Sequence, residues 1–500
     1  MKTGAVDLAL SIREIHTSFI SSVYRSFSSV LFKKVDSMTS RFSLTILLTG
    51  LLTICACAQS RKSGTDSGTY ARTIQPILDA KCTSCHGAGQ EASGLRLDTW
   101  AATMAGSEFG EAVIPFDADN SVLVEMVEKL ASGPHPSESG AATLSAAEVD
   151  QIKGWINEGA VGPDGQIAGA DATDLVYVAN QAEARVYIID AASQTVVRTV
   201  DLQALGYSAN AKPHHVAVEK DGSFWYVSMI AENRVLKFNR NNELVGYADF
   251  QVPGLLTIDR TSDLMFVGRS MAAVNPPQSV GMITRSTMEI DEIGVFHPRP
   301  HAIMMDPAGS YLYSGSLGEN RILTVEIETG DGTVHNVDGT THTLVQFGIT
   351  PDGNTLIVGG QLTGKLFFFD ASNPPALPLK KTIDVNAGPW HPSMSADNKW
   401  AYLGNKMAGT VTVVDMEKMR VAAVIEGDGL SQPHGSALTR DGRFLYVTGN
   451  NLNGGYSARH AFGDNENPGT VTIIDTRTNT IVKVLELGAQ AAGIGTRPVE

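Results

Sequence analysis

The sequence predicts a multidomain protein in which a small all-α domain is followed by an all-β propeller of seven blades. Apolar residues recur at helical spacing between residues 71 and 160. From residue 174 to 500, a short strand motif returns at intervals of 40 to 49 residues. Between these patterns, residues 161–173 are rich in Gly, Ala and Asp, which is typical of a linker.

The composition is typical of a globular, water-soluble chain. Of 500 residues, 43% are apolar and 18% are charged, and this length is enough for two or more cores. The formal net charge of −15 argues against nucleic acid or an anionic membrane surface as a partner.

Residues 1–57 predict an export leader, with Met38 as an alternative start. The apolar run Leu44–Ile54 has the length of a signal-peptide core and is too short to span a bilayer comfortably. The letters Ile-Cys-Ala-Cys that end it resemble a bacterial lipoprotein box, which makes Cys57 the lipidated residue; ordinary secretion or an uncleaved anchor is the alternative. We therefore expect residues 58–70 to be a tether. The body of the protein would lie on the periplasmic or cell-surface side, anchored to the membrane by lipid.

Cys82, Cys85 and His86 form the pattern Cys-x-x-Cys-His, which is typical of covalent attachment of haem c. The two thiols reach the two vinyl groups of the haem, and the adjacent imidazole becomes an axial ligand of the iron. A disulfide or a zinc site is the alternative reading of the two cysteines. In an exported chain, this motif indicates a c-type cytochrome.

The residues around the motif predict helices. One helix runs into the motif, an amphipathic helix is expected at 121–133, and a third follows a Ser cap within 144–160. The runs "GLRLD" and "WINEGA", together with the haem motif, make residues 71–160 similar to the short planctomycete-type cytochrome c domains.

The resemblance leaves the sixth haem ligand open. The family usually supplies it from a Met-Pro pair before the last helix, and this chain has Gly-Pro-His-Pro at 133–136. His135 is therefore the first candidate, with Met126 and Met104 as alternatives. A haem with two imidazole ligands would have a lower potential than one with His and Met.

The repeated motifs predict seven blades of four strands each. The motifs are LVYVAN (175–180), FWYVSM (224–229), LMFVGR (264–269), YLYSGS (311–316), TLIVGG (355–360), WAYLGN (400–405) and FLYVTG (444–449). They resemble the YVTN β-propeller family, which includes lactonase-like members. The tail "AQAAGIGTRP" predicts a seventh innermost strand that closes the ring against the first blade.

Histidines recur where the innermost strand of a blade begins, which lies at one mouth of the central channel. Only His335 falls on an outer strand. The others converge on that mouth or on loops beside it: His214, His215, His297, His301, His342, His391, His434 and His460. Because a Pro-His-Gly sequence is common in YVTN-type propellers, some of these histidines have the alternative reading of polar residues that rim a wet channel.

The histidines lack the accompanying Asp and Glu that calcium or magnesium would require. Imidazole ligands suit copper, zinc, nickel or iron, and an attached haem favours a metal that can exchange electrons. A seven-bladed propeller with a histidine ring resembles nitrous oxide reductase, in which seven imidazoles hold a four-copper sulfide cluster. The resemblance implies a copper site. Its ligands would be His214, His215, His301, His342, His391, His434 and His460, with His297 as the reserve candidate. The copper domain at the C-terminus of that family has no counterpart after the last blade here.

These features predict an oxidoreductase that takes electrons from a periplasmic donor and reduces a small oxidant, with nitrous oxide preferred. Two alternatives stay open: an electron-transfer lipoprotein whose propeller docks a partner, and a protein similar to cytochrome cd1 nitrite reductase that holds a second haem. A lactonase-type hydrolase would not need haem. If the haem and the histidines of one chain lie too far apart, a homodimer would bring them together.

Overall fold

The computed structural model describes residues 68–132, 143–459 and 467–499. The predicted leader, Cys57, His135 and His460 lie outside the described residues. Within the described part of the chain, no helix is long and apolar enough to cross a membrane.

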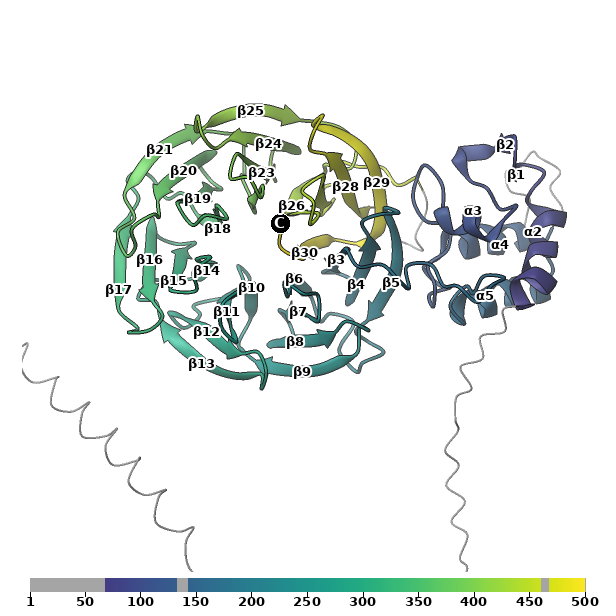
Figure 1. Ribbon diagram of the computed structural model, residues 1–500, viewed down its shortest axis with the longest axis horizontal. Helices are drawn as coiled ribbons and strands as arrows, with labels where there is room; N and C mark the ends of the chain where they lie inside the picture. Colours follow the sequence, from purple (N-terminus) through teal and green to yellow (C-terminus); the bar gives the residue numbers. More distant parts are fainter. Residues whose placement is uncertain (1–67, 133–142, 460–466, 500) are drawn as a thin grey trace, which may run out of the picture. The chain divides into compact units, whose positions relative to one another are not determined.

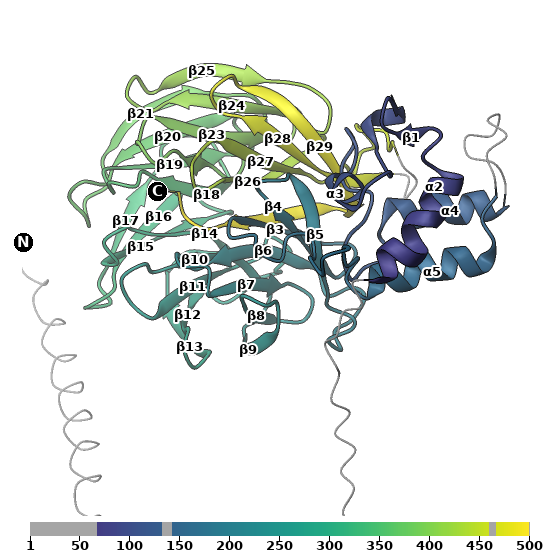
Figure 2. The same ribbon diagram turned by 45° about the vertical axis from the view of Figure 1, so that its right-hand side comes forward.

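The first folded part is helical and small. Its elements are the π-helical turn η1 (Tyr70–Ile74), α2 (Gln75–Lys81), β1 (His86–Gly87), β2 (Gln90–Glu91), the 3₁₀ turn η2 (Ala92–Gly94), α3 (Trp100–Ala105), α4 (Val122–Ser132) and α5 (Ala146–Asn157). Figure 2 shows α4 and α5 side by side, with α2 across them. The helices predicted before the haem motif, at 121–133 and within 144–160, are therefore confirmed.

Local sequence explains how α5 begins and what it buries. The Ser145 side chain accepts the Glu148 backbone N–H, and the Glu148 carboxylate accepts the Ser145 N–H, which is a capping box. Behind this cap, Ile152, Trp155 and Ile156 recur on one face and are buried in the core of the helical part. Each large apolar side chain buried in this way stabilises the fold by about 1.5–3 kcal/mol.

Seven four-stranded antiparallel sheets follow in the described residues and form the blades of the propeller (Figure 1). From the centre outward, blade 1 is β30 (Ala491–Thr496), β3 (Leu175–Asn180), β4 (Arg185–Asp190) and β5 (Thr195–Asp201). Blade 2 is β6 (Pro213–Val218), β7 (Phe224–Met229), β8 (Arg234–Asn239) and β9 (Leu244–Asp249). Blade 3 is β10 (Pro253–Ile258), β11 (Leu264–Arg269), β12 (Ser279–Thr284) and β13 (Glu289–Gly294).

The remaining blades repeat this order. Blade 4 is β14 (Pro300–Met305), β15 (Tyr311–Ser316), β16 (Arg321–Glu326) and β17 (Gly332–Asn336). Blade 5 is β18 (Leu344–Ile349), β19 (Thr355–Gly360), β20 (Lys365–Asp370) and β21 (Leu379–Asp384). Blade 6 is β22 (Ser393–Met394), β23 (Trp400–Asn405), β24 (Thr410–Asp415) and β25 (Arg420–Ile425). Blade 7 is β26 (Pro433–Leu438), β27 (Phe444–Gly449), β28 (Pro468–Asp475) and β29 (Thr480–Ala489).

The ring closes through the last strand. Strand β30 pairs with β3, with Val176 opposite Thr496, so blade 1 combines strands from the two ends of the propeller sequence. The prediction that the tail supplies an innermost strand is confirmed. Figure 1 shows β30 beside β6 and β26 at the centre of the ring.

Apolar side chains from neighbouring blades meet between the sheets. Trp225 of β7 is fully buried and stacks on Phe238 of the same blade, with ring centroids 4.2 Å apart. Its other neighbour is Tyr177 of blade 1, at 4.9 Å. Such contacts hold adjacent blades together. The starts of the inner strands face the centre of the ring.

Candidate functional site

The haem motif follows the end of α2 in a tight turn. The backbone N–H groups of Cys85 and His86 both donate to the Cys82 carbonyl, at 3.1 and 2.9 Å. Cys82 is buried, Cys85 is exposed, and neither forms a disulfide. Burial raises the pKa of the Cys82 thiol to about 11, so this sulfur stays protonated in the absence of haem.

His86 has the features expected of an axial ligand. Its backbone is fixed because its carbonyl accepts the Leu97 N–H at 2.8 Å. Its ring Nδ1 is buried without a hydrogen-bond partner among the described residues. Two free thiols in this spacing, with an adjacent imidazole, fit haem c.

The two methionine candidates for the sixth ligand differ in burial. Met104 of α3 is buried in the same apolar core as Cys82. Met126 of α4 is partly buried. His135, the first candidate from the sequence, lies outside the described residues.

In the propeller, five of the predicted histidines come together at the centre. The ring centroid of His214 lies 5.4 Å from that of His434 and 6.4 Å from that of His301. The ring centroid of His391 lies 5.2 Å from that of His434 and 6.0 Å from that of His215. All five stand at or just before the start of an inner strand, as the sequence predicts. We call these five residues the histidine cluster.

A β-bulge explains how two adjacent histidines join one cluster. Neighbouring residues in a regular strand point to opposite faces. The pairing of β6 with β7 shifts register between Pro213 and Val216, so His214 and His215 occupy a bulge, which re-aims side chains. Inner strands β14 and β26 shift register at their histidines in the same way.

The hydrogen bonds of the rings decide which nitrogens keep a free lone pair. His301 Nδ1 lies 2.8 Å from the Arg269 carbonyl and must donate to it, which leaves the Nε2 lone pair free. This is the arrangement that histidine ligands of metals usually have. His215 is the opposite case, because its Nδ1 accepts the Leu256 N–H at 3.2 Å and the proton of its neutral ring is therefore on Nε2.

The other three histidines carry buried nitrogens without a partner among the described residues. These atoms are Nδ1 and Nε2 of His214, Nε2 of His391 and Nδ1 of His434. A buried polar atom without a hydrogen bond costs about 1–3 kcal/mol. Four such atoms in one cluster of rings leave hydrogen-bonding or ligating capacity for a bound group.

Every imidazole of the cluster is neutral at pH 7. Burial is the main cause, and it lowers the pKa of His215 and of His301 to about 4. Burial and the neighbouring positive charges lower the pKa of His214, His391 and His434 well below 6.5. Neutral imidazole is the form that binds a metal ion.

Two further residues border the cluster, and the sequence reasoning missed both. The Trp390 ring lies 5.3 Å from that of His434. The Lys406 ammonium lies over the Trp390 ring, 4.5 Å from its centroid. Burial lowers the pKa of Lys406 to about 8. Lys406 also lines a pocket of about 620 Å³ between blades 6 and 7.

His342, a predicted ligand, has both ring nitrogens engaged in hydrogen bonds. Its Nε2 donates to the Asp338 carbonyl at 2.9 Å, and its Nδ1 accepts from the Thr363 hydroxyl at 2.8 Å. Neither nitrogen keeps a lone pair for a metal. A metal bound through His342 would require one of these two hydrogen bonds to break, so we leave His342 out of the histidine cluster.

The remaining propeller histidines also lie apart from the cluster or outside the described residues. The reserve candidate His297 contacts the Ser314 hydroxyl through Nε2 at 3.2 Å and the Pro298 carbonyl through Nδ1 at 3.5 Å. His335 lies on the outer strand β17, as predicted. His460 lies outside the described residues.

The spacing of the rings bears on the kind of metal centre. Metal–nitrogen bonds of about 2 Å place the centroids of two imidazoles on one ion about 5 Å apart. The cluster has separations of 5.2 to 6.4 Å, at or above this value. Among the described residues, no group of three or more His, Cys, Asp or Glu side chains is arranged to hold a metal ion.

Together, a small cytochrome domain and a seven-bladed propeller are compatible with a redox or electron-transfer protein. Residues 82–133 match the family model described as Planctomycete cytochrome C. The comparison with curated proteins found no match.

Two solved structures are similar to part of this chain. A functionally unknown protein from Desulfotomaculum acetoxidans DSM 771 is 14% identical, with a TM-score of 0.52 over 65% of this chain and 100% of the other. Hydrazine synthase from Kuenenia stuttgartiensis is 18% identical, with a TM-score of 0.47 over 61% of this chain and 93% of the other. At such low identity, the likeness concerns the fold alone.

Proposed function

We propose that this protein passes electrons from haem c to a copper centre held by the histidine cluster, where a small oxidant is reduced. The observation that carries the proposal is the set of neutral, buried imidazoles of His214, His391 and His434, which have nitrogens without a hydrogen-bond partner among the described residues. Copper is favoured because the donors are imidazoles rather than carboxylates and because zinc has no redox use beside a haem.

The ligands that we propose are His214, His301, His391 and His434, each of which has a nitrogen with no hydrogen-bond partner among the described residues or with a free lone pair. His215 would instead donate a hydrogen bond from Nε2, because its Nδ1 is already an acceptor. The wide ring spacing suits more than one copper ion. A copper–sulfide cluster would fit this spacing, and it would need no further cysteines because its sulfide is inorganic.

The oxidant that we propose is nitrous oxide. Its reduction consumes two electrons and two protons, breaks the N–O bond and yields dinitrogen and water. Bound copper would supply the oxidant's binding site and the two electrons, which the haem delivers singly. Lys406 is suited to give a proton from Nζ, since its lowered pKa eases release and the pocket that it lines allows reprotonation.

The test measures metal content, the absorption spectrum and nitrous oxide reduction by the dithionite-reduced protein. We expect more than one copper per haem and reduction of nitrous oxide, both retained in the control His335→Ala. A second haem chromophore would support the cd1-like alternative. Haem c alone, with no other metal, would support simple electron transfer, and either result would overturn the copper proposal.

For location and partners, we propose an exported lipoprotein that is anchored through Cys57 and receives electrons from a periplasmic donor. The support is the lipobox together with the haem motif, because haem c is attached to proteins outside the cytoplasm. A Cys57→Ala variant should move from the membrane fraction to the soluble fraction. Recovery of this variant in membranes at the wild-type level would count against the lipid anchor.

A further inference from the structure

A second cavity opens at the opposite end of the inner strands. It has a volume of about 680 Å³ and is lined by the ends of β6, β10, β14 and β18 and by the turns after them. His215 lines its inner end. Ligand sites for small organic molecules span about 300–1,000 Å³, so this cavity is large enough for one.

Three cations stand in the turns that follow the inner strands of three consecutive blades around this cavity. They are Arg497 after β30, Lys220 after β6 and Arg260 after β10. The residues equivalent to Lys220 and Arg260 in the next two blades are Pro307 and Pro351. The positive side chains therefore form an arc along one side of the cavity, which we call the cationic arc.

The cationic arc has no carboxylate within ion-pairing distance among the described residues. Arg497 donates only to the backbone carbonyls of Lys220 and Thr173, at 3.0 and 3.3 Å. Arg260 lines the cavity and is exposed as a whole residue. Protein atoms packed around its guanidinium still lower the pKa of this group by desolvation. A crowded cation without a partner gains more from an anion than one in open water.

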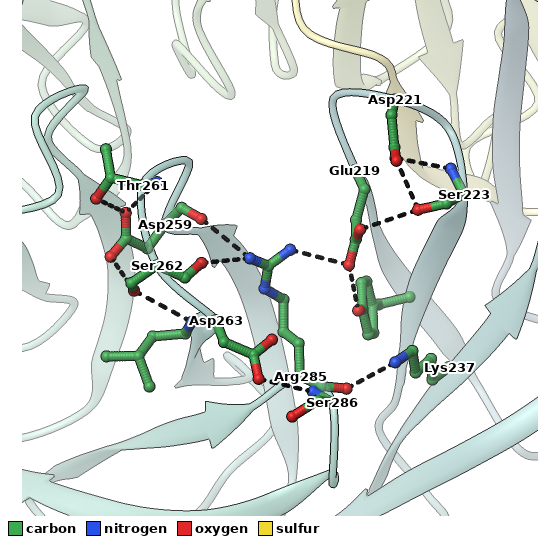
Figure 3. Close-up of polar contacts among 12 residues, drawn as sticks. Glu219, Asp221, Ser223, Lys237, Asp259, Thr261, Ser262, Asp263, Arg285 and Ser286 are labelled. Carbon is green, nitrogen blue, oxygen red and sulfur yellow. Dashed lines mark hydrogen bonds and ion pairs between the residues drawn. The ribbon is translucent and has the colours of Figure 1, made fainter.

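The carboxylates that line the cavity are already engaged. Figure 3 shows Glu219 beside Arg285, with an N–O distance of 2.9 Å, and Asp221 bonded to Ser223. In the same view, Asp259 accepts from the N–H and hydroxyl of Thr261, each at 2.8 Å.

The Asp306 carboxylate is likewise engaged. It accepts hydrogen bonds from the backbone N–H groups of Ser310 at 2.7 Å and Tyr311 at 2.8 Å. None of these carboxylates forms an ion pair with the cationic arc, so the arc keeps cations that an anion in the cavity can pair with.

The facing side of the cavity is apolar. Met304, Ile349 and Met394 line it and are only partly buried, as are Pro351 and Pro392 beside them. Charge on one wall and apolar side chains on the other suit a ligand with two unlike ends.

We propose that this cavity binds an organic carboxylate with an apolar body. The carboxylate would lie against Arg260 and Lys220, and the body against Met304, Ile349 and Met394. The site uses neither the haem nor the proposed copper ligands. Its failure and the failure of the proposed redox function can therefore be told apart.

Calorimetric titration of the haem-loaded full chain tests the proposal with octanoate, with neutral octanamide and with inorganic phosphate. We expect octanoate to bind at least about tenfold tighter than octanamide, because only octanoate can pair with the cationic arc. Inorganic phosphate should bind weakly because it lacks an apolar body. Equal affinity for octanoate and octanamide, or phosphate binding as tight as that of octanoate, would overturn the proposal.

Two variants locate the site. Arg260→Gln should reduce octanoate binding to the level of octanamide and leave octanamide unchanged. The control Arg420→Gln, on the exposed outer strand β25, should behave like the wild type. Wild-type octanoate affinity in Arg260→Gln would contradict the assignment. So would an equal loss in both variants.

Discussion

His301 and His342 are both buried histidines of the propeller, yet they differ in what they can offer a metal. His301 gives its Nδ1 proton to a backbone carbonyl and keeps Nε2 free. His342 uses one nitrogen as a donor and the other as an acceptor. The difference lies in the second partner, Thr363, whose hydroxyl occupies the remaining lone pair of His342. Residue type and position alone could not separate these two cases.

Exchange of both His214 and His215 for alanine should empty the metal site. Both lie at the start of β6, outside the apolar cores between blades, so the fold and the haem should remain. We expect copper per haem to fall to background in the double variant. The control His342→Gln should keep wild-type copper and lose about 1 kcal/mol of stability with its hydrogen bonds. Unchanged metal content in the double variant would show that the pair only lines the channel.

Replacement of Cys82 and Cys85 by alanine should abolish covalently bound haem. The two thiols are free, and no other cysteine is present in the described residues. The measurement is a denaturing gel stained for the peroxidase activity of haem, with His335→Ala as the stained control. Haem stain that persists in the double variant would contradict attachment at this motif.

At the scale of the strands, the sequence predicted more of the fold than of the site. Each of the seven motifs, such as FWYVSM at 224–229, forms one strand with the expected bounds, because buried β-branched and aromatic residues mark it. The bulges were not predictable, since they depend on pairing with the next strand. Lys406 directly follows β23, at the end where the histidines stand. Of the residues that directly follow a second strand, Lys406 is the only charged one, and this signal could have revealed it.

The close approach of β30 to β6 depends on Gly493. A Cβ at this position would lie 1.8 Å from the His214 carbonyl oxygen and 2.6 Å from its carbon, both backbone atoms. Gly493→Ala should therefore destabilise the propeller by about 3 kcal/mol or more and lower its copper content, since β6 would have to move. Thermal unfolding and metal analysis test this.

The matched control for this change is Gly294→Ala, at the end of the outer strand β13. A Cβ there would have ordinary contacts of 3.7 and 3.8 Å with Phe296. We expect unfolding close to that of the wild type. Similar melting temperatures for the two variants would argue against a tight contact at Gly493.

At the scale of the whole molecule, the ring concentrates five neutral imidazoles at one place, where four of them are buried. Each blade supplies at most two of them, and the closure by β30 brings blades 7 and 2 close enough for His434 to lie beside His214. The cluster therefore exists only when the ring is complete. Its protonation should be coupled to the unfolding of the propeller as a unit.

This coupling predicts that stability falls as the pH is lowered. The unfolded chain takes up protons on these histidines near pH 6.5, whereas His215 and His301 in the folded protein take them up only near pH 4. Between these values the unfolded state binds more protons, so the free energy of unfolding decreases by about 1.4 kcal/mol per pH unit for each such histidine. Urea unfolding of the metal-free protein, followed by circular dichroism, should show this loss from about pH 6.5 downward. His301→Gln removes one of the titrating groups and should make the slope shallower by about one proton. A free energy of unfolding that stays constant from neutral pH to about pH 5 would mean that the histidines are not held neutral by the ring.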